Sequence, residues 1–410
     1  MSDKSEAKKC APSATTTTSA STDPGKAVED AMELQERLFE EFIAGQRRTL
    51  KAFEMMMNPP KVEVGTTRCE EVYRKNRMRL LHYFPVDENG GTKFKTPLLI
   101  VYAVINRPYI LDLQPDKSVV RRFLEKGFDV YLIDWGYPKR NDQYICLDDY
   151  IQSYIDSSVD FICERSGSDK VSFLGYCLGG YFTTIYSAVH PDKVRNLMVM
   201  AAPIQFQVDR GLLHKWSGNK AFDPEAVVQV LGNAPADFLN SGFLMLDPLQ
   251  NGYLKYYHLI MNLDDPKFVD NFMRMEKWIG DGIEIPGRFY VELIKEGYQE
   301  NRLVKGQLSI EDKMVNLKDI GMPLMIIIGR DDHLVPKEST LGLAGCVSSK
   351  DVTIAEFPAG HIGVSVGGKA HKEMWPRIAD WLAERSEPLK SGGAGKGAGG
   401  AGRASGKRKR

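Results

Sequence analysis

A cysteine held between two glycines at the end of an apolar segment constrains this chain more than any other feature. Residues 170–176 have the composition of a buried β-strand, Cys177 follows in the pattern Gly175-x-Cys177-x-Gly179, and residues 178–190 favour a helix. A nucleophile on such a tight strand-to-helix turn is strained, and side chains in place of the flanking glycines would collide with neighbouring backbone. The N-terminus of the helix favours a thiolate. The pattern therefore predicts a nucleophilic Cys177, whereas an isolated cysteine would be interpreted as buried and structural.

A nucleophile in this setting is expected to have an acid and then a histidine as partners later in the chain. Residues 322–329 are typical of a fully buried parallel strand, and Asp331 and Asp332 follow its end. Residues 351–357 predict the last strand, which is followed by His361 in a glycine-rich turn. Because functional groups gather at the carboxyl ends of strands in open α/β sheets, these side chains are expected to converge.

The neighbours of these residues leave two alternatives. Asp331 is the rival acid because it stands beside Asp332, and His333 is the rival histidine on the same loop. Of the seven histidines, only His361 lies in a glycine-bracketed turn after a late strand. We therefore expect Cys177, Asp332 and His361 to be the catalytic residues.

Strands and helical segments alternate through the first half of the chain. Strands are expected at 97–105, 128–135, 170–176 and 194–202, with helices near 115–126, 148–165 and 178–190. This alternation predicts right-handed crossovers and a parallel sheet. The pattern then stops for about 120 residues that are rich in Met and aromatic side chains. The sequence predicts an α/β-hydrolase fold, with a mostly parallel sheet and a helical cap inserted after the sixth strand.

The sequence divides into five regions of different composition. We expect a disordered low-complexity N-terminus at 1–22, an amphipathic helix at 23–58, a catalytic core at 59–203 and 310–387, a cap or lid at 204–309, and a disordered basic Gly/Ala tail at 388–410.

The amphipathic helix has clear start and stop signals. Asp23 is its candidate N-cap, Pro24 occupies the first helical position, and Asn58-Pro-Pro60 ends it. Its apolar stripe either packs on its own domain, which is the default interpretation, or stays exposed for a partner subunit. The stripe consists of Met32, Phe39, Phe42, Ile43, Leu50, Phe53 and Met57.

Composition narrows the class of protein further. With 43% hydrophobic residues the chain can bury a large core, and no segment has the pattern of a signal peptide or a membrane span. The six cysteines show no metal-ligand spacing, so we expect no metal and a reducing cytoplasm. Formal net charge is zero, but residues 390–410 carry seven basic residues and no acidic one. We interpret this tail as a solvated end. The alternative interpretation is a non-specific contact with an anionic surface or with nucleic acid, and no specific nucleic-acid partner is expected.

Five motifs in order resemble polyhydroxyalkanoate synthases from about residue 60 to residue 385. Besides the Cys177 turn they are Ile105-Asn-Arg-Pro-Tyr-Ile-Leu-Asp-Leu113, Tyr131-Leu-Ile-Asp-Trp135-Gly-Tyr-Pro138, Gly329-Arg-Asp-Asp332-His-Leu-Val-Pro336 and Gly360-His361-Ile-Gly-Val. The compact length is similar to the class III catalytic subunit, which works with a second, non-catalytic subunit. The N-terminal extension and the basic tail depart from that pattern.

The resemblance implies polymerisation of an (R)-3-hydroxyacyl-coenzyme A, such as the 3-hydroxybutyryl thioester, with release of coenzyme A. Cys177 would form the acyl-thioester enzyme, His361 would move the protons, and Asp332 would orient His361 or help to activate the hydroxyl. Backbone N–H groups of Leu178 and of the loop near Ile105 would form the oxyanion hole. No cofactor is expected, because coenzyme A belongs to the substrate.

The resemblance also implies partners and a location, and other functions stay open. We expect a second synthase subunit, a polyester granule surface in the cytoplasm, and a homodimer or hetero-oligomer. A thioesterase or dienelactone-type hydrolase of the same fold is one alternative. A non-enzymatic granule-coating protein, suggested by the amphipathic helix and the basic tail, is the other.

Overall fold

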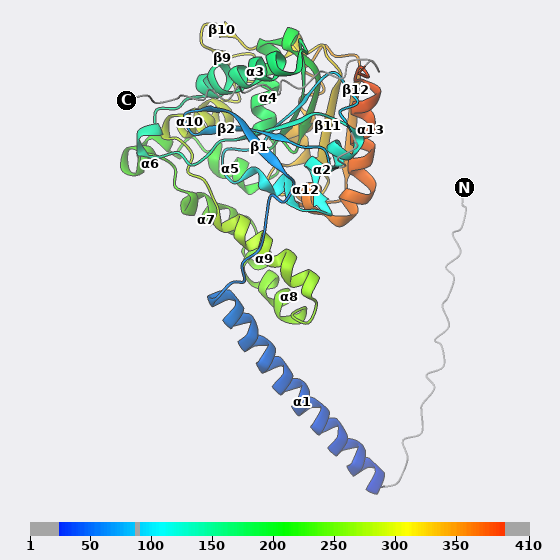
Figure 1. The fold of residues 1–410 in the computed structure, drawn as a ribbon. Helices are drawn as coiled ribbons and strands as arrows, with labels where there is room; N and C mark the ends of the chain where they lie inside the picture. Colours follow the sequence, from blue (N-terminus) through cyan, green and yellow to red (C-terminus); the bar gives the residue numbers. More distant parts are fainter. Residues whose placement is uncertain (1–23, 87–90, 390–410) are drawn as a thin grey trace, which may run out of the picture.

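An eight-stranded, mostly parallel sheet lies at the centre of the structure, a computed structural model that describes residues 24–86 and 91–389 (Figure 1). Its strands are β1 (Cys69–Lys75), β2 (Met78–Tyr83), β3 (Leu98–Val101), β6 (Val130–Asp134), β7 (Val171–Tyr176), β8 (Val194–Met200), β11 (Leu324–Gly329) and β12 (Val352–Phe357). The spatial order is β1-β2-β6-β3-β7-β8-β11-β12. Pairing is antiparallel between β1 and β2 and between β2 and β6, and parallel between all later neighbours.

The central strands are buried along their whole length. Every residue of β3, β6, β7 and β11 is buried, as expected for parallel strands that helices cover on both faces. The edge strand β12 is different, because its side chains alternate between partly buried and exposed positions over most of its length. The continuous apolar runs of the sequence therefore mark the strands that carry the site.

Two groups of helices cover the sheet. The helices that connect or follow its strands are α2 (Val119–Lys126), η3 (Asp149–Ile155), α3 (Asp156–Ser166), α4 (Leu178–Val189) and α13 (Trp375–Glu384). The connection from β3 to β6 runs across the sheet in the opposite direction to those from β6 to β7 and from β7 to β8. Right-handed crossovers therefore place α2 on one face and η3, α3 and α4 on the other. Helix α13 packs against α2, and α4 packs against η3.

Short elements complete the core. They are η1 (Pro108–Leu111), β4 (Asp112–Gln114), β5 (Lys117–Ser118), η2 (Arg140–Asp142), η4 (Pro191–Lys193), η7 (Leu317–Asp319), α11 (Lys337–Leu341), α12 (Gly363–Val366) and η8 (Ala370–Met374). Strands β4 and β5 form a separate two-stranded sheet. The carboxylate of Asp112 there accepts hydrogen bonds from Thr67 and Ser118, which fixes the loops beside β3.

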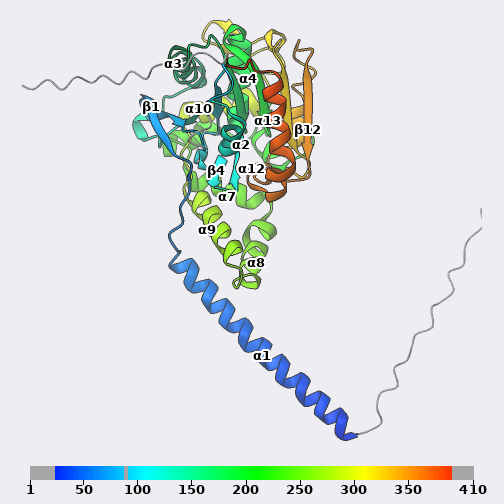
Figure 2. The same cartoon turned by 45° about the vertical axis from the view of Figure 1, so that its right-hand side comes forward.

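A run of helices separates β8 from β11. They are α5 (Leu212–Ser217), α6 (Pro224–Leu231), α7 (Ala236–Leu246), η5 (Leu249–Leu254), α8 (Lys255–Met261), α9 (Pro266–Gly280), α10 (Gly287–Glu292) and η6 (Leu293–Gln299), and the two-residue strands β9 (Ser309–Ile310) and β10 (Lys313–Met314) follow. Because β8 is the sixth strand of the central sheet in chain order, the predicted insertion point is confirmed. Helices α7, α8 and α9 project beyond one end of the core (Figure 2).

The first two strands were missed in the sequence, and some predicted bounds were too long. Strands β1 and β2 lie near the edge of the sheet, and β1 contains four charged residues among its seven, so it lacks the apolar run of a central strand. Strand β3 ends at Val101, because residues 102–107 leave the sheet as a loop. The helix predicted near 115–126 begins only at Val119.

Helix α1 (Pro24–Met57) extends away from the rest of the protein (Figures 1 and 2). Only its last turns pack on the insertion, where Ala52 joins a small apolar cluster with Leu259 of α8 and Phe272 of α9. The default interpretation of its stripe is therefore wrong, because most of these side chains reach into solvent. Met32, Phe39, Phe42, Leu50, Phe53 and Met57 are each more than half exposed.

The predictions for the two ends of the chain lie largely outside the described residues. This applies to the low-complexity segment 1–22, to the N-cap Asp23 and to nearly all of the basic tail. Within the described part, no helix is both long enough and apolar enough to span a membrane.

One buried histidine in the insertion has no polar contact. His214 of α5 is 4% exposed, packs against the rings of Phe206 and Tyr298, and makes no hydrogen bond with either ring nitrogen. Burial lowers the pKa of His214 to about 4, although the charge of Asp332 acts in the opposite direction. Between about pH 6.5 and pH 4 this ring is therefore neutral in the folded protein but protonated in the unfolded chain.

This difference predicts an acid-sensitive contribution to stability. The unfolded histidine takes up a proton below about pH 6.5 and the folded one only near pH 4, so stability is lost as the pH falls between these values. His214→Phe removes that loss, which is about 2 kcal/mol at pH 5. Denaturant unfolding at pH 5 and pH 7.5 should show the variant gaining relative to the wild type at the lower pH. An equal difference at both pH values would contradict this origin.

Candidate active site

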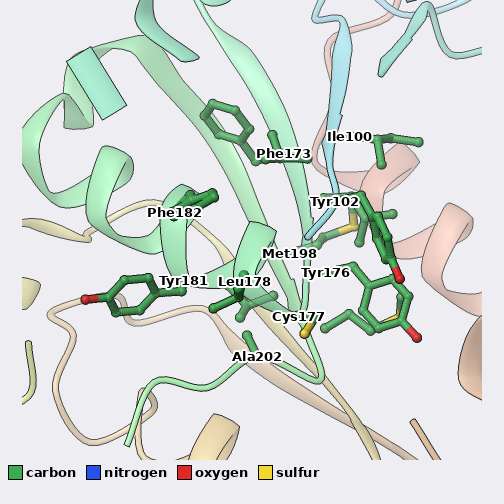
Figure 3. Close-up of a cluster of buried hydrophobic side chains, with 14 of the residues drawn as sticks. Ile100, Tyr102, Phe173, Tyr176, Cys177, Leu178, Tyr181, Phe182, Met198 and Ala202 are labelled. Atoms are coloured by element: carbon green, nitrogen blue, oxygen red, sulfur yellow. The ribbon is translucent and has the colours of Figure 1, made fainter. Parts of the chain in front are cut away.

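Cys177 occupies the turn between β7 and α4 in a strained backbone conformation. Its φ is 54° and its ψ is −126°, a combination that non-glycine residues rarely adopt. Its N–H donates to the carbonyl oxygen of Met200 at 3.0 Å, which ties the turn to the end of β8. Figure 3 shows the thiol at this junction, near Tyr176 and Leu178. The side chain is 7% exposed, so the sulfur lies at the bottom of a nearly closed site.

Glycine is needed on both sides of Cys177 because other atoms of the chain lie very close to these two positions. A Cβ at Gly179 would lie 2.0 Å from the carbonyl oxygen of Val101, and one at Gly175 would lie 2.1 Å from Oγ1 of Thr183. No real Cβ tolerates such distances, so both positions require glycine. The sequence prediction of a steric requirement at 175 and 179 is confirmed.

The structure brings Asp332 and His361 together beside this turn. The Nδ1 of His361 lies 2.7 Å from Oδ2 of Asp332, and both side chains are almost fully buried. Oδ1 of Asp332 accepts hydrogen bonds from the N–H groups of Leu334 and Val335 at 2.9 and 2.8 Å. The carboxylate is therefore held by three donors in one orientation.

The rival residues of the sequence analysis lie elsewhere. Asp331 is exposed and faces Arg330 at 3.7 Å, and His333 is exposed on the same loop.

The two candidates for the oxyanion hole, Ile105 and Leu178, lie close to Cys177. Ile105 lines the cavity above Cys177, and its carbonyl oxygen accepts a hydrogen bond from the N–H of Ile283 at 2.8 Å. Leu178 is the first residue of α4, where an N–H group has no acceptor within the helix.

The charge of His361 is coupled to both of its neighbours. Burial opposes the protonated ring, but the charges of Asp332 and Cys177, and a hydrogen bond to each of them, raise the pKa of His361 to about 10. The imidazole therefore holds a proton at neutral pH. A protonated imidazole beside a cysteine sulfur favours the thiolate, which is the form that attacks a carbonyl carbon.

A cavity of about 270 Å³ lies over the thiol, between the core and the inserted helices. Its floor includes Cys177, His361 and Tyr102, and its roof comes from α7, α8 and α9, with Leu244 and Trp278 among the lining residues. Most of its surface is carbon. An apolar cavity of this kind excludes water from the thiol and strengthens the electrostatic interactions inside it.

The comparisons with known proteins agree with this geometry. Residues 97–367 match the model of the alpha/beta hydrolase fold family, and residues 40–123 match that of the N-terminus of poly-beta-hydroxybutyrate polymerase. The poly(3-hydroxyalkanoate) polymerase subunit PhaC of Haloferax mediterranei is 45% identical over 87% of this chain and 72% of its own. The subunit PhaC of Allochromatium vinosum is 42% identical over 85% of this chain and 98% of its own. The chain belongs to the poly(3-hydroxyalkanoate) polymerase family.

Solved structures match the chain at lower similarity. A monoacylglycerol lipase of Paleococcus ferrophilus is 18% identical, with a TM-score of 0.43 over 72% of this chain and 98% of its own.

In this polymerase-family chain, the loop after β3 is tied to the inserted helices. Nε1 of Trp278 donates to the carbonyl oxygen of Arg107 at 2.9 Å, and the hydroxyl of Tyr109 donates to Asp281 at 2.6 Å. On the core side, the guanidinium of Arg107 bonds to Asp134 at the end of β6 at 2.8 Å. Helix α9 therefore fixes the loop that lines the cavity above Cys177.

Sequence reasoning missed these positioning residues. It also missed Tyr176, whose hydroxyl donates to the carbonyl oxygen of His361 at 2.7 Å and holds the histidine loop against β7. Its place directly before the nucleophile was the available signal. Trp278 lay in a segment predicted as part of the cap, but nothing in the sequence pairs it with Arg107.

The bond from Trp278 predicts a selective loss of rate. Trp278→Phe keeps most of the ring but leaves the carbonyl of Arg107 unpaired, so the loop loses about 1 kcal/mol of fixation. We expect kcat for thiol release to fall about fivefold with KM nearly unchanged, and the free energy of unfolding to fall by about 1 kcal/mol.

Trp381→Phe is the matched control. Trp381 is similarly buried, and its Nε1 donates at 2.9 Å to Oγ1 of Thr353. Thr353 lies at the N-terminal end of β12, away from the turn that carries His361. The control should lower stability by a similar amount without lowering kcat. Equal effects of the two variants on kcat would contradict a positioning role for Trp278.

Proposed function

We propose that this chain polymerises an (R)-3-hydroxyacyl-coenzyme A, with 3-hydroxybutyryl-coenzyme A as the preferred substrate, and releases coenzyme A. The observation that carries the proposal is the buried Cys177, His361 and Asp332 arrangement under an apolar roof, in a chain of the polymerase family. The catalytic residues are these three.

Acylation follows from the charge coupling at His361. The Cys177 thiolate attacks the thioester carbonyl and expels the coenzyme A thiolate, which takes the proton from His361. Because the sulfur charge helps to raise the pKa of His361, forming a neutral thioester removes that contribution. The ring therefore becomes a stronger acid at the moment when the leaving group needs a proton.

Elongation uses the ring in its neutral state. His361 takes the proton of the 3-hydroxyl group of the next substrate, and the alkoxide attacks the acyl thioester on Cys177. The sulfur leaves as a thiolate, and the lengthened chain, still a coenzyme A thioester, returns to Cys177 by a second attack that releases coenzyme A. Asp332 keeps Nδ1 of the ring occupied and stabilises its charge, so Nε2 faces the reacting groups.

The oxyanion formed in each step needs donors. The N–H of Leu178 at the start of α4 and an N–H of the loop around Ile105 are our candidates, because α4 begins directly after Cys177 and the loop lines the cavity above the thiol. A thiol also suits repeated transfer better than a hydroxyl. Passage between thioesters is nearly balanced in energy, whereas an oxyester would release the chain slowly.

We also propose a partner subunit and a location for the reaction. Relatives are named subunits, and the apolar stripe of α1 is exposed, which together favour a class III arrangement with a second, non-catalytic subunit. A homodimer or hetero-oligomer at the surface of a cytoplasmic polyester granule fits this stripe. No cofactor takes part in the steps above.

The triad is tested by thiol release from 3-hydroxybutyryl-coenzyme A, measured together with polymer. Cys177→Ala and His361→Gln should each reduce release at least about a thousandfold, because they remove the nucleophile or the proton carrier. Retention of more than a few per cent of the rate by Cys177→Ala would place the chemistry on another residue.

The two adjacent carboxylates provide a matched pair. Asp332→Asn should lower the rate on the order of a hundredfold or more, because the amide cannot stabilise the charged ring. Asp331→Asn changes an exposed side chain and should be nearly neutral. A larger effect at Asp331 would overturn the assignment of the acid, and thiol release without polymer would favour a thioesterase.

A further inference from the structure

A second and larger cavity adjoins the one above the thiol. It has a volume of about 510 Å³ and lies among α5, α7, α10 and η6. Its lining residues include no lysine, arginine, aspartate or glutamate, and they are almost entirely aliphatic or aromatic. No step of the reaction described above uses it.

The two cavities share a wall close to the reactive sulfur. Ile105 and Phe243 line both of them, one from the loop after β3 and the other from α7. Tyr298, which also lines the second cavity, is near enough to Cys177 for the sulfur charge to act on its phenol group. The second cavity is therefore a neighbour of the thiol.

The chemistry of the two linings differs. The cavity above the thiol includes Lys255 and the polar side chains of Asn106, Asn240 and Asn251. The second cavity offers no cation for the phosphates of coenzyme A, so an ionic carrier is unfavourable there. An uncharged chain of esters and methyl groups suits such a surface, because it brings apolar area and no group that requires a charged partner.

The cavity above the thiol has a fixed volume, which a growing chain would exceed. Each turnover lengthens the chain on Cys177 by one unit, whereas the cavity above the thiol holds only about 270 Å³. The chain must therefore leave that cavity while it remains attached. The second cavity ends in an apolar rim at the surface, where Trp216, Phe238 and Met245 are each more than 40% exposed.

We propose that the second cavity binds the elongating polyester while the chain is still attached to Cys177, and that the substrate enters through the first. The inference rests on the proposed polymerase function. Ile105 and Phe243 then form the boundary that the chain crosses, and the apolar rim is where it reaches solvent or the polymer surface.

Gly242 of α7 offers a way to fill this cavity without disturbing the core. It lines the cavity, and a Cβ built there meets nothing within 4 Å. Gly242→Leu places an apolar side chain in the space and also favours the helix over glycine. Ser241→Leu, at the next position of the same wall, is the second variant.

The experiment compares two thioesters in the first turnover: coenzyme A carrying one 3-hydroxybutyryl unit, and coenzyme A carrying its linear trimer. Gly242→Leu should release thiol from the single unit within about twofold of the wild-type rate. It should react about tenfold more slowly with the trimer and make a severalfold shorter polymer. Ser241→Leu should act in the same direction.

Gly280→Leu is the matched control. Gly280 ends α9, is exposed and also meets nothing within 4 Å of a built Cβ, but it lines neither cavity. This control should leave both thioesters and the polymer length unchanged.

Three results would overturn the proposal. One is an unchanged ratio between trimer and single unit in Gly242→Leu and Ser241→Leu. Another is an unchanged polymer length in both variants. The third is a change of oligomeric state in sedimentation with an unchanged ratio, which would assign the cavity to an interface between copies of the chain. Failure of the wild type to release thiol from either thioester would instead reject the polymerase function itself.

Discussion

The contact between the start of α4 and the end of β3 is the constraint on which the site depends. The backbone at Gly179 lies so close to Val101 that a single added carbon would lie 2.0 Å from its carbonyl oxygen. This approach holds Cys177 at a positive φ and points its thiol toward the carboxyl edge of the sheet. A larger residue would move the helix away and take the thiol out of reach of His361, so local strain and catalytic geometry have one cause.

The electrostatics of the site depend on how firmly the acid is held. Asp332 reaches His361 with one oxygen and uses the other to accept two backbone N–H groups, so rotation of its carboxylate would break several bonds at once. The fixed negative charge keeps the buried ring protonated against the cost of burial. In the proposed mechanism the charge on the sulfur changes during the reaction, and this change would let one ring act first as acid and then as base.

The inserted helices do more than cover the thiol. Helix α9 shares an apolar cluster with α1 through Phe272, and its Trp278 donates to the loop after β3. Both contacts belong to the same helix. The exposed stripe of α1 and the wall of the catalytic cavity therefore belong to one connected structure, although they are far apart in the sequence.

The sequence by itself determined the strand-to-helix turn at Cys177, the chain order of Cys177, Asp332 and His361, and the position of the inserted helices. Each of these has a local signal: a steric need for glycine, an apolar run, or the loss of strand periodicity. Strands β1 and β2 had no such signal, because charged and polar side chains interrupt their apolar residues.

Only the tertiary structure decided which acid meets His361, where the stripe of α1 lies and which cavities adjoin the thiol. Asp331 and Asp332 are neighbours with the same chemistry, and the loop conformation alone turns one inward. The pairing of Trp278 with Arg107 likewise joins residues 171 positions apart. Such contacts depend on how separate segments pack against one another, and no local pattern of residues contains that information.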